Sequence, residues 1–389
     1  MVGFRECLRA VCCAVLVILP SVGLWAEVGD VPPPPEVGAK AHILIDPNNN
    51  QVLTQDNADQ HLAPASLTKL MTAYTVFKEL CAGRITLDSE VRISRRAWRM
   101  GGSKMFINKG TDVTVGDLLK GLIIQSGNDA AVALAEFSAG SVESFADLMN
   151  SNAKDLGLAD SHFVNPTGLP TRDHYSSARD LALLTTVLIQ EFPEYYYYFS
   201  ELEFSYQPPG ETPIAQPNRN KLLRWDSSVD GVKTGYTEEA GYCLAASARR
   251  DGMRLISVIL GAETGKQRFK SSQALLNWGF DFFENLPMFT AGRSLEQVRV
   301  WKGNLERVDL GTLNDAHVTV PRGRFDQLQI ETEISGEPVA PVGKNRILGM
   351  VAVTLDGETL LERPLVTLQG VGQGSLWHRI VDAVRLWAQ

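Results

Sequence analysis

The sequence has no excess of positive charge and no concentrated basic stripe. Its 389 residues include 37 Lys and Arg against 45 Asp and Glu, for a net charge of −8. Because proteins that bind nucleic acid carry basic patches that neutralise phosphates, nucleic acid is excluded as a partner. Hydrophobic residues make up 44% of the chain, which is ordinary for a globular protein and excludes general disorder.

Patterns of metal-binding side chains are also lacking. His42 lies in an apolar strand pattern, and Asp173-His174 has no further ligand at a suitable spacing. His61 lies five residues before Ser66, but the sequence identifies no acid that would complete a serine–histidine triad. We therefore expect no metal and no other cofactor.

Cysteine is scarce in the part of the chain that we expect to fold. Cys7, Cys12 and Cys13 lie in a segment that resembles a leader, which leaves Cys81 and Cys243. Two distant cysteines in an exported protein permit one disulfide. Since nothing in the sequence places them together, the favoured interpretation is two separate buried thiols.

The N-terminal segment has the order of a secretory signal. Arg5 and Arg9 precede an apolar run over 10–19 and a short exit segment, with the best cleavage point after Ala26. The run is short for a membrane span, although a retained leader could serve as an anchor. We expect an exported protein on the periplasmic side of the cytoplasmic membrane.

Changes in composition divide the chain. A hairpin is expected over 41–53, helices dominate from Ser66 to about Glu191, two strands follow over 241–248 and 254–261, and short alternating runs fill the region after 292. The predicted organisation is a signal peptide over 1–26, a linker over 27–38, a catalytic domain over 39–288, a β-sandwich over 289–369, and a hinge with an amphipathic helix over 370–389.

The C-terminal helix has one apolar face. That face carries Leu376, Trp377, Ile380, Val381, Val384 and Trp387, and arginines lie mostly on the other side. A helix of this kind suits the membrane–water interface, which makes the membrane surface an expected partner. The alternative is a helix that docks on the protein's own sandwich.

Three short motifs carry the chemistry. In Ser66-x-x-Lys69, helical spacing places the lysine amine beside the serine hydroxyl, where a lysine with a lowered pKa could act as the base. Ser126-Gly127-Asn128 interrupts a helical pattern and projects polar side chains from a turn, and Lys233-Thr234-Gly235 precedes a predicted strand. Each motif alone also fits a helix cap, an ordinary turn or an exposed lysine.

In this order, the three motifs resemble those of the active-site serine penicillin-recognising enzymes. The chain is most similar to the low-molecular-mass penicillin-binding proteins that act as D-alanyl-D-alanine carboxypeptidases. The resemblance extends to the segment 175–180, to Asn218-Arg219-Asn220, to the sandwich and to the tail. It implies an α/β (α+β) catalytic domain of the penicilloyl-serine transferase and beta-lactamase type, with a central antiparallel sheet and a helical cluster.

The resemblance implies catalytic roles for four residues. Ser66 would be the nucleophile and Lys69 the general base. Ser126 would relay a proton to the leaving amine, and Lys233 would keep the local field positive, which together with a second cation would help Lys69 to stay neutral.

It also implies substrate-binding roles. Asn128 would bind the substrate amide, and the strand with Thr234 and Gly235 would bind the peptide as an added strand. The backbone N–H groups of Ser66 and Tyr236 would form the oxyanion hole. The terminal carboxylate would be bound by Thr234 and Arg268, with Arg219 in support. Tyr236 departs from the family, in which many members have His.

Several functions compete on this evidence. The resemblance implies removal of the terminal D-alanine from peptidoglycan stem peptides, and acylation by beta-lactams. The alternatives are a beta-lactamase, an endopeptidase that acts on peptidoglycan cross-links, and a non-catalytic scaffold that binds through the sandwich. A dedicated deacylating glutamate motif is not apparent, which disfavours the beta-lactamase.

Overall fold

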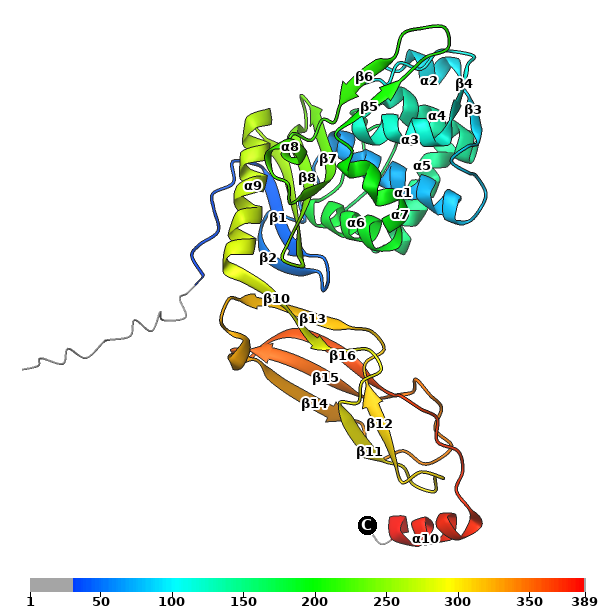
Figure 1. Ribbon diagram of the computed structural model, residues 1–389, viewed down its shortest axis with the longest axis vertical. Helices are drawn as coiled ribbons and strands as arrows, with labels where there is room; N and C mark the ends of the chain where they lie inside the picture. The colour runs from blue at the N-terminus through cyan, green and yellow to red at the C-terminus, as the bar shows by residue number, and fades with distance from the viewer. Residues whose placement is uncertain (1–30, 388–389) are drawn as a thin grey trace, which may run out of the picture.

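The computed structural model describes residues 31–387, so the predicted signal peptide and its three cysteines lie outside the described residues. Figure 1 shows an elongated molecule, with the helical region at one end, a β-domain below it and α10 at the far end.

A five-stranded antiparallel sheet organises the first region. Its order is β2-β1-β9-β8-β7. The strands are β1 (Ala41–Asp46), β2 (Gln51–Asp56), β7 (Val229–Thr237), β8 (Gly241–Arg250) and β9 (Met253–Ala262). The expected hairpin and strand pair are confirmed, and β7, with Lys233-Thr234-Gly235, lies at the edge of the sheet.

Helices cover both faces of this sheet. The long helix α9 (Gly265–Phe282) packs on one face, and a cluster of helices packs on the other (Figure 1). The side chains of β8 contact both layers of helices, because successive side chains of a strand point to opposite faces of the sheet. Leu244 and Ala246 belong to the core beneath α9, whereas Cys243 and Ala245 belong to the core beneath the cluster.

The cluster consists of short and medium helices with two small hairpins. Its helices are α1 (Thr68–Cys81), α2 (Arg95–Arg99), α3 (Val115–Ile124), α4 (Asn128–Ala139), α5 (Val142–Asp155), α6 (Ala178–Glu191) and α7 (Pro193–Tyr196). The hairpins pair β3 (Glu90–Arg92) with β4 (Asp112–Thr114), and β5 (Glu203–Tyr206) with β6 (Ile214–Pro217); α8 (Leu222–Trp225) leads into β7. Ser177 caps α6 by accepting a hydrogen bond from the Asp180 N–H at 3.1 Å.

The second region is the expected all-β sandwich. A five-stranded sheet has the order β11-β12-β16-β15-β14, and β10 pairs with β13. The strands are β10 (Phe283–Phe289), β11 (Glu296–Arg299), β12 (Arg307–Gly311), β13 (Ala316–Pro321), β14 (Gln329–Ile334), β15 (Ile347–Leu355) and β16 (Glu358–Thr367). Since β10 begins at Phe283, the boundary that we expected at 288 falls inside a strand of this region, and the composition change that suggested it comes a few residues too late.

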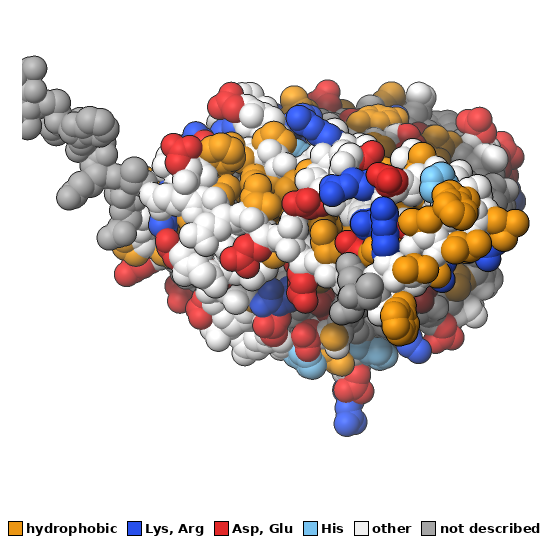
Figure 2. Space-filling model, turned by 90° about the horizontal axis from the view of Figure 1, so that it is seen from below, with side chains coloured by type: hydrophobic (Ala, Val, Ile, Leu, Met, Phe, Trp, Pro, Cys, Tyr) orange, Lys and Arg blue, Asp and Glu red, His pale blue; other side chains and the backbone are white. Residues whose placement is uncertain are grey.

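The C-terminal helix α10 (Leu376–Trp387) contacts the sandwich through Asp382, and its half-buried residues are Val381, Asp382 and Leu386. The Asp382 carboxylate accepts a hydrogen bond from the Lys302 N–H at 2.7 Å and lies 3.6 Å from the Arg299 guanidinium. The apolar face points outward, with Trp377 at 72% exposure and Trp387 at 90%. Hydrophobic side chains gather at this end of the molecule in Figure 2.

Two further predictions concern cysteine and membrane-spanning helices. Cys81 and Cys243 are both free, and Cys243 is buried as expected, but Cys81 is exposed. This corrects the prediction of two buried thiols: Cys81 is the last residue of α1, where its thiol faces Glu194 rather than the core. Within residues 31–387, the helices are all too short or too polar to cross a bilayer.

Candidate active site

Ser66 and Lys69 lie at the start of α1. A short 3-10 turn over Ala65–Leu67 leads directly into the helix, so the two residues are one turn apart. The Lys69 ammonium donates a hydrogen bond to Ser66 Oγ at 3.0 Å. Because Lys69 is only 1% exposed, the alternative of a capping serine beside a solvated lysine does not fit.

The Lys69 amine has two further partners. It donates to Asn128 Oδ1 at 2.7 Å and to the Thr167 carbonyl at 2.8 Å. Burial lowers the pKa of Lys69 to about 7, and the nearby charge of Asp129 opposes this shift. Desolvation is the main cause of the lowered pKa, since it penalises the charged amine directly.

The second motif forms the expected turn between two helices. α3 ends at Ile124 and α4 begins at Asn128, with Ser126 in the left-handed conformation at φ 60°. The Ser126 hydroxyl is buried, and no group within residues 31–387 forms a hydrogen bond with it. A strained serine with an unsatisfied hydroxyl is typical of a functional position.

Asn128 is placed differently from our expectation. Its Oδ1 accepts from Lys69, its Nδ2 donates to the Gly101 carbonyl at 2.7 Å, and its side chain is buried behind the pocket. In this state the carboxamide orients the base instead of presenting itself to a substrate amide.

Two supports of the site escaped the sequence analysis. The Asp129 carboxylate accepts hydrogen bonds from the N–H groups of Met105, Phe106 and Ala130 at 2.9–3.0 Å. These bonds hold the loop that contains Met105 and Phe106 against the Ser126-Gly127-Asn128 turn. The second support, the loop over 165–170, supplies the Thr167 carbonyl to Lys69.

That loop lies very close to the nucleophile's turn. Gly168 has a φ of 77°, and a Cβ at this position would overlap the Ala65 carbonyl. His174 holds the same region: its Nδ1 accepts from the Val164 N–H at 3.0 Å, so its Nε2–H donates to Thr68 Oγ1 at 2.8 Å. Burial lowers the pKa of His174 to about 4 and keeps the ring neutral.

The third motif lies on β7, beside Ser66. A Cβ on Gly235 would lie 3.0 Å from the Pro64 carbonyl and 3.2 Å from the Ser66 nitrogen, so glycine allows the strand to approach the nucleophile. Lys233 is buried, and its ammonium donates to the Thr234 carbonyl at 3.0 Å. Burial lowers the pKa of Lys233 strongly, as do the charges of Lys69, Arg268 and Arg219.

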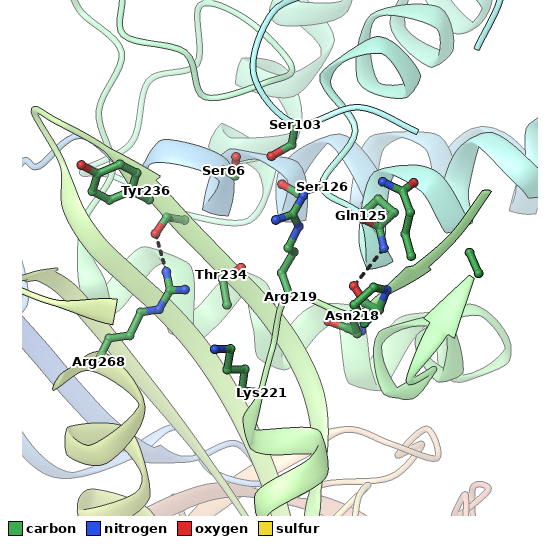
Figure 3. Close-up of a pocket in the computed structure, with 14 residues that line it drawn as sticks. Ser66, Ser103, Gln125, Ser126, Asn218, Arg219, Lys221, Thr234, Tyr236 and Arg268 are labelled. Atoms are coloured by element: carbon green, nitrogen blue, oxygen red, sulfur yellow. Dashed lines mark hydrogen bonds between the residues drawn. The ribbon is translucent and has the colours of Figure 1, made fainter. Parts of the chain in front are cut away.

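A pocket of about 550 Å³ opens beside Ser66 (Figure 3). The predicted residues that line it are Ser66, Ser126, Arg219, Thr234, Gly235, Tyr236 and Arg268, whereas Lys69, Asn128 and Lys233 lie behind its wall. Arg268 donates to the Gly235 carbonyl at 2.8 Å, and its Nε is buried without a partner. Burial lowers the pKa of Arg268 to about 10.

The remaining candidates lie outside this constellation. His61 pairs with Asp160 at 2.9 Å and stacks on Tyr175, so the acid that the sequence could not identify exists, but the Ser66 hydroxyl bonds to Lys69 instead. Over residues 31–387, the His, Cys, Asp and Glu side chains form no group of three that could hold a metal.

A half-buried serine is bonded to a desolvated lysine, with a second serine, a second lysine and an edge strand beside them. This arrangement is typical of serine acyl-transfer enzymes in which a lysine serves as the base. Sequence comparison specifies the class. The family model for D-alanyl-D-alanine carboxypeptidase (Peptidase S11) matches residues 29–264, and that for the C-terminal domain of penicillin-binding protein 5 matches 283–373. The chain belongs to the Peptidase S11 family of D-alanyl-D-alanine carboxypeptidases.

Individual relatives agree along almost the whole chain. It is 42% identical to the D-alanyl-D-alanine carboxypeptidase DacA of Escherichia coli over 365 residues, which covers 92% of this chain and 89% of the relative. The structure of penicillin binding protein 5 from Haemophilus influenzae has a TM-score of 0.83 and 40% identity, and covers 88% of this chain and 99% of that one. The D-alanyl-D-alanine endopeptidase of Escherichia coli is 28% identical over 63% of this chain and 78% of the relative.

Proposed function

We propose that this protein is a serine-type D-Ala-D-Ala carboxypeptidase that removes the terminal D-alanine of peptidoglycan stem pentapeptides. The observation that carries the proposal is the 3.0 Å hydrogen bond between Ser66 Oγ and a lysine whose pKa burial lowers to about 7. Family membership supplies the substrate class, which the geometry alone does not identify.

Acylation begins when neutral Lys69 takes the proton of Ser66 Oγ and the oxygen attacks the carbonyl carbon of the penultimate D-alanine. The resulting oxyanion is stabilised by the N–H groups of Ser66 and Tyr236, a role supported by the close approach of Gly235 to the Ser66 backbone. The amide C–N bond then breaks, and the proton that Lys69 took reaches the leaving amine through the Ser126 hydroxyl. Water then hydrolyses the acyl-enzyme, which releases the shortened peptide and restores Ser66.

The terminal carboxylate binds at Thr234 and Arg268, with Arg219 in support. Two features support this assignment: all three residues line the pocket, and a second nitrogen of the Arg268 guanidinium is buried without a partner. In Figure 3, Arg268 and Arg219 lie on opposite sides of Thr234, and the Arg219 guanidinium lies beside Ser126. A beta-lactam carboxylate would use the same donors, and its ring carbonyl would acylate Ser66.

One experiment separates the candidate activities. Purified mature protein should release D-alanine from a pentapeptide that ends in D-Ala-D-Ala, and S66A should abolish the release. Mass spectrometry after addition of penicillin should show a long-lived adduct on Ser66. Rapid hydrolysis of penicillin without an adduct would identify a beta-lactamase, and absence of D-alanine release from any such peptide would contradict the proposal. Cross-linked peptides test the endopeptidase alternative, which the similarity to a relative of that name favours.

We further propose that the mature protein is exported and held on the periplasmic surface of the cytoplasmic membrane by α10. The support is the outward apolar face, with Trp377 and Trp387 largely exposed, on a helix that is fixed to the sandwich through Asp382. Fully burying a large apolar side chain contributes about 1.5–3 kcal/mol, and interfacial burial less, so several together give reversible binding.

Deletion of the residues after Gln373 tests the anchor. The truncated protein should move from the membrane to the soluble exported fraction while its activity on small peptides stays unchanged. If it remains on the membrane after verified leader cleavage, the anchor lies elsewhere.

A further inference from the structure

The pocket beside Ser66 is lined by more positive charge than a single terminal carboxylate requires. Arg219, Lys221 and Arg268 all line it, and its wall includes no Asp or Glu. For residues 31–387, the ion pairs within 4.0 Å involve none of these three cations. Three unpaired cations around one cavity attract anions, because nothing within the site neutralises them.

Lys221 is the cation that the proposed reaction does not use. Arg268 and Arg219 are assigned to the terminal carboxylate, whereas Lys221 is an exposed residue directly before α8 (Leu222–Trp225). In Figure 3, Thr234 lies between Ser66 and Lys221. Since the acyl group binds at Ser66 and the terminal carboxylate at Thr234, Lys221 lies on the side that receives the rest of the leaving group.

The cavity also has room for a larger leaving group. Its volume of about 550 Å³ is in the range of pockets that hold drug-sized ligands, well above what one alanine fills. Gln216 and Asn218 from the β6 (Ile214–Pro217) side line it together with Lys221, and their amide groups donate to the Lys104 and Glu201 carbonyls. A roomy, polar and cationic compartment suits an amine that carries a carboxylate of its own.

We infer that Lys221 is a specificity-determining residue that binds a second carboxylate on the leaving group. This inference rests on the proposed function, and the chemistry is unchanged: Ser66 Oγ forms the ester, the amide C–N bond breaks, and the amine leaves with the proton that Ser66 gave up. Two sources share this leaving-group chemistry, an acidic C-terminal D-amino acid and the stem peptide released from a cross-link.

The test uses three acyl-D-Ala peptides that end in D-Ala, D-Glu or D-Gln, with the full mature protein. D-Gln matches D-Glu in size but lacks the charge. We expect the ratio of kcat/KM for D-Glu to that for D-Gln to exceed one in the wild type, to fall about fivefold in K221Q and further in K221E, and to approach one at 1 M salt, because solvent-exposed ion pairs are screened. K266Q is the matched control: it removes the same charge from α9 two residues before Arg268, outside the pocket wall, and should keep the wild-type ratio.

The outcomes separate this inference from the proposed function. The role of Lys221 is overturned if the kcat/KM ratio of D-Glu to D-Gln is the same in the wild type and K221Q, or if it falls equally in K266Q. Release of D-Ala in the same experiment would still support the carboxypeptidase function. Absence of cleavage of all three peptides overturns the function itself. Two cross-linked peptide dimers, with and without a free carboxylate on the leaving stem, distinguish the two sources. If the wild type but not K221Q prefers the dimer with the carboxylate, the cross-link is the source. If neither protein shows this preference, the source is the acidic terminal residue.

Discussion

The active site and the junction between the two regions bury polar groups in opposite ways. Around Ser66, the Ser126 hydroxyl and the Arg268 Nε have no partner among residues 31–387, and the buried amines of Lys69 and Lys233 have no carboxylate of that part of the chain within 4.0 Å. An unpaired buried polar group destabilises the fold. The unpaired Ser126 hydroxyl and Arg268 Nε therefore indicate a site whose missing polar partners arrive with the substrate.

At the junction, by contrast, buried polar groups satisfy one another. Asp46 accepts hydrogen bonds from Asn285 at 2.8 Å and from the Thr319 hydroxyl. Gln51 donates to the Thr319 carbonyl at 2.8 Å and accepts from its N–H at 3.2 Å, and Asn49 donates to the His317 carbonyl at 3.4 Å. The turn between β1 and β2 thus binds β13 and β10, which fixes the two regions to each other without providing a reactive group.

The largest effect is expected from a substitution in the active site. K69R keeps a positive charge but does not release a proton near neutral pH, so acylation of Ser66 by penicillin should fall by about 10³-fold. Mass spectrometry of the adduct over time measures this loss. K78R on the same helix, where Lys78 bonds to Asn152, is the control and should acylate normally. Near-normal acylation of K69R would remove Lys69 from the role of base.

A smaller effect is expected from a substitution at the junction between the two regions. D46A leaves the Asn285 amide and the Thr319 hydroxyl without their acceptor, so the free energy of unfolding should fall by roughly 2–4 kcal/mol. Denaturant titration measures the loss, and hydrogen exchange should locate it at β10 and β13. D56A, at the exposed end of the same hairpin, is the control. If D46A lowered acylation as strongly as stability, the two regions would not be functionally separate.

The smallest effect concerns the support behind the nucleophile. The pKa of His174 is lowered to about 4 in the folded protein from an unperturbed 6.5, so the unfolded state binds more protons between these values. The stability contributed by neutral His174 is complete above pH 6.5 and decreases as the pH falls toward 4, by about 2 kcal/mol between pH 7 and pH 5.

The variant H174Q tests this pH dependence, because glutamine also offers a donor and an acceptor but does not titrate. Urea denaturation from pH 5 to 7 should show a weaker decrease in unfolding free energy for H174Q than for the wild type. Parallel curves for the two proteins would show that His174 is not responsible.

Sequence reasoning predicted the parts of the site that depend on local spacing. Ser66 and Lys69 share a helical turn, and Gly127 separates two helices, so neighbouring residues alone determine both features. The sandwich also followed from short alternating runs along the chain, whereas the edge position of β7 followed only from the resemblance to the penicillin-recognising enzymes. The motif residues were thus predictable, because their reactive groups are side chains and the sequence identifies side chains directly.

The supports were missed because they carry no such signal. The Thr167 carbonyl reaches Lys69 from 98 residues away and is a backbone atom that every residue has. Asp129 binds backbone N–H groups of a distant loop, and Asn128 turns toward Lys69 because of that packing. The prediction of a buried Cys81 was wrong, because its place at the end of α1 exposes the thiol.

The central claim is that burial makes Lys69 the base, and the pH dependence of acylation tests it most directly. Only the unprotonated amine accepts the Ser66 proton, so the second-order rate constant for acylation by penicillin should rise about tenfold per pH unit below 7 and level off above, with an apparent pKa near 7. A rate constant that is flat from pH 5 to 9, or that still rises steeply at pH 9 as for an ordinary lysine, would contradict the account.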